Sequence, residues 1–151
     1  MLGERLSQLG LALPATQPAL ASYVPARRTG NLLLLSGHIS RVGGVVARGI
    51  VGDDIDVATA AQMARDIALD LIASAAAAVG SVDALVGVVR ITGYVRSAPG
   101  FDRQATVING ASDLLVELFG EAGRHARSAV GVSELPLGAA VEIEAILEVA
   151  G

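Results

Sequence analysis

Apolar residues recur every three or four positions in three stretches of the chain, which is the spacing of an amphipathic helix. The longest stretch covers residues 57–79, and Gly80 behind it is typical of a helix end. The second covers residues 101–119. The third is short, from residue 2 to residue 13, and Pro14 would end it. We therefore predict two long helices and a short helix at the N-terminus.

Other segments have the patterns of β-strands. Residues 32–37 form a short apolar run between turn residues, whereas residues 85–95 and 140–149 alternate between apolar and polar positions. Gly43 and Gly44 predict a hairpin turn that returns the chain to pair with residues 32–37. The predicted strands are residues 32–37, 45–47, 85–95, 126–132 and 140–149. Residues 14–28 include three prolines and are predicted to form an irregular loop.

Alternation gives each long strand one apolar face and one mixed face. In residues 85–95 we expect Val89, Ile91 and Val95 on the core face and Arg90, Thr92 and Tyr94 on the other. In the last strand the core face holds Val141, Ile143, Ala145, Leu147 and Val149, and the other face holds Glu142, Glu144, Ile146 and Glu148. The element order β-β-α-β-α-β-β predicts an α+β fold in which two helices pack on one face of a mixed sheet. The uncovered face still carries apolar residues, so we predict that identical subunits bury it.

The composition narrows the range of functions. The chain has 151 residues, of which 52% are hydrophobic and 17% are charged, so it is expected to fold as a globular protein. Cysteine and lysine are absent, which excludes thiolate and Schiff-base chemistry. The net charge of −4 disfavours nucleic acid as a partner. No membrane span or targeting segment is apparent, so we expect a cytoplasmic protein with no membrane partner.

No standard enzymatic motif is present, neither G-x-S-x-G nor H-E-x-x-H nor a dinucleotide fingerprint. The two histidines, His38 and His125, are far apart in sequence. We expect one of them in a loop and the other at a helix end, both on solvated surface. No metal site is therefore predicted.

Arg127 is the charged residue whose neighbours in the sequence most favour a role in ligand binding. Its neighbours within residues 126–129 are small, which leaves room for the guanidinium to project into a cavity and bind a carboxylate through two hydrogen bonds. The alternative is a structural ion pair across the sheet with Glu142 or Glu144. From these residues alone both interpretations stay open.

Several segments resemble the Rid family, the reactive intermediate deaminases also called YjgF-type or L-PSP-type proteins. The segments that carry the resemblance are Tyr23-Val24-Pro25-Ala26, Leu35-Ser36-Gly37-His38-Ile39, Val107-Ile108-Asn109-Gly110, Ala126-Arg127-Ser128-Ala129-Val130, and the stretch from Leu135 to Ile146. The last two are the most specific. The resemblance divides the chain into a helical N-terminal extension, residues 1–22, and a Rid-like domain, residues 23–151.

The resemblance implies a chorismate-mutase-like fold that assembles into a homotrimer. The sites then lie in clefts between neighbouring subunits and take a small 2-imino or 2-keto carboxylate. Members of the archetypal branch hydrolyse enamines and imines, such as 2-aminoacrylate and 2-iminopropionate, to a 2-keto acid and ammonia. They do so without a metal or an organic cofactor.

The resemblance also implies roles for individual residues. Arg127 matches the arginine that binds the substrate carboxylate, and Glu142 matches the residue that positions the attacking water. The residues matched to substrate-binding positions are Tyr23, Ser36, Gly37, Asn109 and Ala129. This chain departs from the pattern in three places: His38 replaces a common Gln, Ala129 replaces the Cys of the archetype, and one more residue separates Asn109 from Arg127.

Two alternative functions accompany this hypothesis. In the first, the protein is a trimeric carboxylate-binding or regulatory protein without turnover. In the second, it is an endoribonuclease, as an older family name suggests. The acidic balance and the scarcity of aromatic residues weigh against RNA as a substrate.

Overall fold

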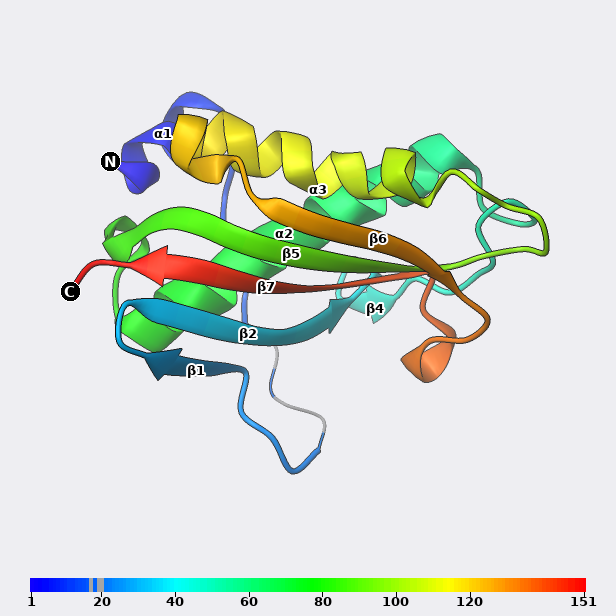
Figure 1. Cartoon of the computed structure of the whole chain (residues 1–151), viewed down its shortest axis with the longest axis horizontal. Coiled ribbons are helices and arrows are strands. Elements are labelled where there is room, and N and C mark those ends of the chain that lie inside the picture. The colour runs from blue at the N-terminus through cyan, green and yellow to red at the C-terminus, as the bar shows by residue number, and fades with distance from the viewer. Residues whose placement is uncertain (17, 19–20) are drawn as a thin grey trace.

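Five strands form one mixed β-sheet, and two long helices cover one of its faces (Figure 1). The structure is a computed structural model that describes residues 1–16, 18 and 21–151. The strands are β1 (Ala26–Thr29), β2 (Leu32–Ile39), β5 (Leu85–Arg96), β6 (Ala126–Val132) and β7 (Val141–Val149), in the spatial order β1-β2-β7-β5-β6. β6 runs parallel to β5, and the other neighbouring strands are antiparallel.

The remaining elements lie outside this sheet. β3 (Arg41–Val42) and β4 (Val45–Val46) form a hairpin, and the helices are α1 (Leu2–Gln8), α2 (Val57–Val79) and α3 (Gln104–Phe119). Short 3-10 turns occur at Val82–Ala84, Gly120–Gly123 and Pro136–Gly138. The predicted α+β mixed sheet with two helices on one face is confirmed. None of the helices in the described part of the chain is long and apolar enough to cross a membrane.

α2 has the predicted boundaries, and its ends explain why. Asp56 accepts a hydrogen bond from the backbone N–H of Thr59 at 2.7 Å, which satisfies one of the unpaired amides at the helix start. The same bond lowers the pKa of the Asp56 carboxyl. Gly80 ends the helix in the left-handed region, with φ +86°, where glycine is favoured. α3 begins three residues later than predicted, at Gln104.

The helices cross closely at a glycine of α3. A Cβ atom on Gly110 would overlap the carbonyl oxygen of Ala61 in α2 and would stand 2.8 Å from its carbonyl carbon. The missing side chain therefore lets the two helix backbones approach each other. Because Asn109 precedes Gly110, this contact also sets the position of a predicted site residue.

The helix-covered face of the sheet forms the core. Ile91, Val141 and Ile143 are fully buried there, and the predicted alternation of β7 is confirmed. No helix formed by the described residues lies on the opposite face (Figure 1), where Leu34 and Val130 remain more than a third exposed.

The prediction for β5 is wrong at one position. A register shift between Val88 and Arg90 turns Val88 into the core and leaves Val89 exposed. Such a bulge inverts the alternation locally, and a strict period of two cannot anticipate it.

Three further predictions differ from the structure. β1 begins at Ala26, inside residues 14–28, for which the sequence predicts a loop; positions 17, 19 and 20 of that stretch are outside the described residues. The first helix ends at Gln8 rather than at residue 13, and Gly10 follows in a left-handed conformation. The chain after the Gly43-Gly44 turn pairs with β3 instead of residues 32–37.

Candidate active site in two parts

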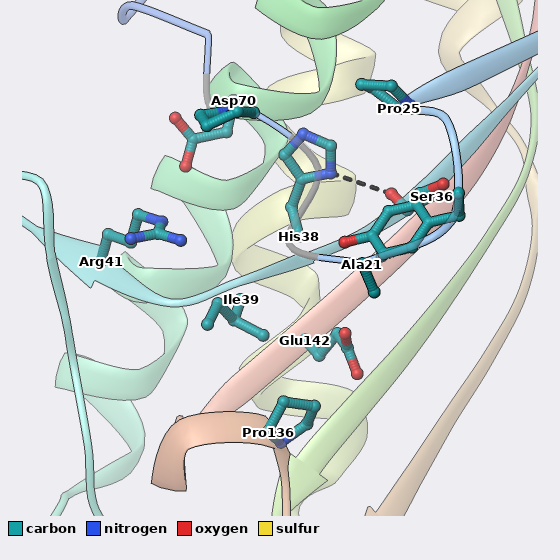
Figure 2. Close-up of a pocket in the computed structure, with 12 residues that line it drawn as sticks. Ala21, Pro25, Ser36, His38, Ile39, Arg41, Asp70, Pro136 and Glu142 are labelled. Atoms are coloured by element: carbon teal, nitrogen blue, oxygen red, sulfur yellow. Dashed lines mark hydrogen bonds between the residues drawn. The ribbon is translucent and has the colours of Figure 1, made fainter.

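A pocket of about 280 Å³ opens beside the start of β7 (Figure 2). Its described lining residues are Pro18, Ala21, Tyr23, Pro25, Ser36, Gly37, His38, Ile39, Arg41, Asp70, Pro136 and Glu142. Figure 2 shows Arg41 and Asp70 on one side of the pocket and Glu142 beside Pro136 on another. The structure therefore brings together four of the predicted site residues, from Tyr23 to Glu142.

Glu142 has an environment that disfavours its charged form. It lies opposite Tyr94 of β5 and Ile39 of β2 in the sheet. Burial raises the pKa of the Glu142 carboxyl, and the nearby carboxylate of Glu144 raises it further. A Cβ atom on Gly37 would stand 2.7 Å from a carboxyl oxygen of Glu142, so glycine provides the space that this side chain occupies.

His38 lines the same pocket as Glu142. Its Nδ1 lies 2.9 Å from the carbonyl oxygen of Ser36, and its Nε2 lies 2.8 Å from the hydroxyl of Ser74 in α2. A carbonyl only accepts, so Nδ1 carries a proton; in the neutral imidazole the Ser74 hydroxyl then donates to Nε2. The prediction that His38 lies in a solvated loop is wrong, because it belongs to β2 and is tied to α2.

Asp70 forms the far side of the same pocket. It projects from α2, and burial raises the pKa of its carboxyl, although His38 and Arg41 partly offset the effect. The described residues contain no group of three His, Cys, Asp or Glu side chains arranged to hold a metal ion.

Arg127 does not line this pocket. Its Nη1 donates to the Asn109 side-chain oxygen at 2.7 Å and to the Ser112 hydroxyl at 3.1 Å, both on α3, and its Nη2 lies 3.4 Å from the carbonyl of Ala105. Within the described part of the chain it forms no ion pair with Glu142 or Glu144. The structural ion pair considered as the alternative is therefore absent.

Within one chain, Arg127 and Glu142 project from opposite faces of the sheet. Arg127 lies opposite Ile91, which points into the core beneath the helices. Glu142 alternates with the buried Val141 and Ile143, so it points to the other face. The predicted site residues thus form two groups. The pocket is lined by Tyr23, Ser36, Gly37 and Glu142. Asn109 and Arg127 meet beside α3, and Ala129 lies on the same face of the sheet as Arg127.

Two residues beside Arg127, Ser112 and His125, are not among the predicted site residues. Ser112 lies between Arg127 and His125, and its hydroxyl is 2.9 Å from Nε2 of His125. The sequence contained a signal for both. Ser112 follows Asn109 by three positions on a helix, and His125 precedes Arg127 by two positions in extended chain, so each pair shares a face.

Comparisons with known proteins assign the family. The family model described as "YjgF/chorismate_mutase-like, putative endoribonuclease" matches residues 3–148. The chain is 42% identical over 150 residues to Protein TCP17 of Trypanosoma cruzi. The aligned region covers 97% of this chain and 93% of that protein.

Solved structures agree with this assignment. Protein Atu1372 of Agrobacterium tumefaciens, of unknown function, has a TM-score of 0.88 at 43% identity over 99% of this chain and 94% of that one. RidA from the Antarctic bacterium Psychrobacter has a TM-score of 0.61 at 26% identity over 89% of this chain and 94% of that one. The family match extends over almost all of the sequence, and this chain belongs to the YjgF/chorismate-mutase-like family of Rid-type proteins.

Proposed function

We propose that this protein is a cofactor-free hydrolytic deaminase that converts small 2-imino acids and their enamine tautomers to 2-keto acids and ammonia. It acts as a homotrimer in which Arg127 of one subunit faces Glu142 of the next. The observation that carries the proposal is the environment of Arg127: a guanidinium held by neutral oxygens, with no carboxylate of the described chain to neutralise it. Such a cation is suited to an external carboxylate.

The arrangement in two groups supports a site between subunits. Arg127 and Glu142 cannot act on one small molecule within one chain, because they project from opposite faces of the sheet. The uncovered sheet face carries Glu142 together with exposed apolar side chains such as Leu34 and Val130. A neighbouring copy that buries this face would bring its own edge strand β6, and with it Arg127, close to the pocket.

Glu142 has the properties that imine hydrolysis needs. The water oxygen bonds to C2 of the protonated imine while one water proton passes to Glu142, which gives a neutral carbinolamine. Glu142 returns this proton to the nitrogen, the C2–N bond breaks with its electron pair leaving on ammonia, and the hydroxyl loses its proton as the carbonyl forms; no electrons are exchanged with another reagent. A carboxyl group whose pKa burial raises towards neutrality accepts and returns this proton more efficiently than an ordinary glutamate.

The first test measures ammonia release from imines that an amino-acid oxidase generates in situ. Arg127→Ala is expected to lower kcat/KM about a hundredfold, because each hydrogen bond between charged groups contributes about 1.5–3 kcal/mol. Glu142→Gln is expected to lower kcat by about a hundredfold or more, the usual contribution of a general base. The matched control is Arg124→Ala, which removes an exposed arginine that pairs only with Glu121 among the described residues.

The second test mixes two inactive variants. If each site takes Arg127 from one subunit and Glu142 from the next, a trimer that contains both Arg127→Ala and Glu142→Gln chains has one intact site. Random exchange at equal amounts then restores about a quarter of the wild-type activity. No recovery after verified exchange would contradict the shared site. Tight binding of 2-keto acids without turnover by the wild type would instead favour the carboxylate-binding alternative.

A further inference from the structure

A chain of hydrogen bonds leads from Arg127 away from the proposed substrate position. Nη1 of Arg127 lies 3.1 Å from the Ser112 hydroxyl, this hydroxyl lies 2.9 Å from Nε2 of His125, and Nδ1 of His125 lies 2.6 Å from the carbonyl oxygen of Gly123. These hydrogen bonds connect β6, α3 and the turn between them. All three side chains are half-buried, so water competes only partly for these bonds.

The two ends of this chain determine the direction of every bond in it. The Gly123 carbonyl only accepts, so Nδ1 of His125 donates to it. In a neutral imidazole Nε2 is then an acceptor, and the Ser112 hydroxyl donates to it. The hydroxyl proton is thereby turned away from Arg127, and the Ser112 oxygen presents its lone pairs to Nη1.

The donor count of the guanidinium then decides which edge is left for a ligand. Arginine has five N–H groups, of which Nη1 carries two, Nη2 two and Nε one. Both Nη1 protons have acceptors, on Asn109 and Ser112. Nη2 has only the 3.4 Å contact to Ala105, and Nε has no hydrogen bond to any described residue. A carboxylate that needs two parallel hydrogen bonds can therefore use the Nε–Nη2 edge, but not the Nη1–Nη2 edge.

We propose that Ser112 and His125 are positioning residues that hold Nη1 of Arg127, so that the substrate carboxylate is bound by the Nε–Nη2 edge of the guanidinium. This inference rests on the proposed function. Neither residue touches the substrate. Without them, Nη1 would keep only its bond to Asn109, so the guanidinium on this edge strand could turn about that one contact, and it would lose this freedom when the substrate binds.

The kinetic test compares Ser112→Ala, His125→Ala and His125→Gln. Ser112→Ala and His125→Ala are expected to raise KM about tenfold and to change kcat less than about twofold, because the carboxylate contact is made equally in the bound substrate and in the transition state. His125→Gln is expected to restore KM to within about threefold of wild type, since its amide oxygen accepts from Ser112 as Nε2 does. Asp113→Ala, at an exposed position on the same helix, is the matched control.

The outcomes separate this inference from the proposed function. A wild-type KM for both Ser112→Ala and His125→Ala, beside a large loss in Arg127→Ala, overturns the positioning role alone. A wild-type KM for Arg127→Ala overturns the proposed function. Melting curves show whether each variant is folded. Ser112→Ala and His125→Ala each break the series of hydrogen bonds at a different residue, so one folded alanine variant is enough for the test.

A spectroscopic test is independent of activity. The ¹⁵N chemical shifts of the His125 ring are expected to show a protonated Nδ1 and an unprotonated Nε2 in the wild-type protein. The chain has two histidines, so the His38→Gln variant assigns the signals. A protonated Nε2 with a bare Nδ1 would contradict the hydrogen-bond direction derived above and would overturn the proposal.

Discussion

Replacing Gly110 with alanine tests the close crossing of α2 and α3. Glycine within a helix usually destabilises it by about 1 kcal/mol relative to alanine, so propensity alone predicts that Gly110→Ala stabilises the protein. The structure predicts the opposite. The new Cβ would overlap the carbonyl oxygen of Ala61; Cβ is fixed directly to the α3 backbone and the oxygen belongs to the α2 backbone, so neither can move without its helix.

The magnitude follows from comparing the two effects. Adding a methyl group to a well-packed contact costs about 1–3 kcal/mol, and occasionally more when backbone must shift. An overlap with backbone puts Gly110→Ala at the upper end of that range, so the loss exceeds the gain in propensity by about 2 kcal/mol. For a chain of this size, this difference lowers Tm by about 4–8 °C.

Differential scanning calorimetry measures the shift, and Asp113→Ala on the exposed side of the same helix is the control. The control is expected to change stability by less than about 0.5 kcal/mol. A Gly110→Ala protein that melts above wild type, as propensity predicts, would refute the argument from close approach. Displacement of α3 would also move Asn109, so we expect weaker substrate binding in the same variant.

Three other substitutions test individual contacts. Glu142→Gln is expected to raise Tm at pH 7, because burial raises the pKa of Glu142 above its unfolded value and ionisation therefore destabilises the fold. The gain in Tm should vanish below about pH 4.5, where the wild-type carboxyl is protonated in both the folded and the unfolded state. Asp56→Ala is expected to lower Tm at pH 7, because the hydrogen bond from Thr59 lowers the pKa of Asp56 in the folded protein. The stabilisation by the Asp56 carboxylate is lost as the pH falls through that folded-state pKa, so the difference in Tm should shrink in melts measured down to pH 2. Ser40→Ala is expected to cost about 1–3 kcal/mol in urea denaturation, because the fully buried hydroxyl donates to Ala47 and accepts from the amides of Ala140 and Val141. A pH-independent effect in either acidic variant, or a neutral Ser40→Ala, would contradict these assignments.

The sequence predicted the elements whose burial is periodic. α2 and β7 each bury one continuous face, so their apolar residues repeat at 3.6 and 2 positions and their boundaries are visible in the sequence. β1 was missed because it is an edge strand that pairs only with β2 and is mostly exposed, with no apolar repeat. The exposure of Val89 could not be predicted, since a bulge depends on the partner strand.

The candidate site was predictable residue by residue but not in its arrangement. Motif resemblance identified Arg127 and Glu142, but their projection from opposite faces depends on the order of strands in the sheet, which spacing along the chain does not reveal. Whether Arg127 acts on Glu142 depends on the same arrangement: within one chain Arg127 lies on the other face, and burial followed by the Glu144 carboxylate raises the pKa of Glu142. The contact of His125 with Ser112 was not predicted, because Ser112 lies on another element.

Part of the pocket wall comes from the linker between α1 and β1, through Pro18, Ala21 and Tyr23, whereas Ser36 and Glu142 stand on strands. An extra residue in a strand disturbs its pairing with the neighbouring strands, whereas a linker tolerates insertions and deletions. Evolution can therefore reshape the cavity in this lineage through the length of one connecting segment, and selectivity can diverge while the reactive groups stay in place.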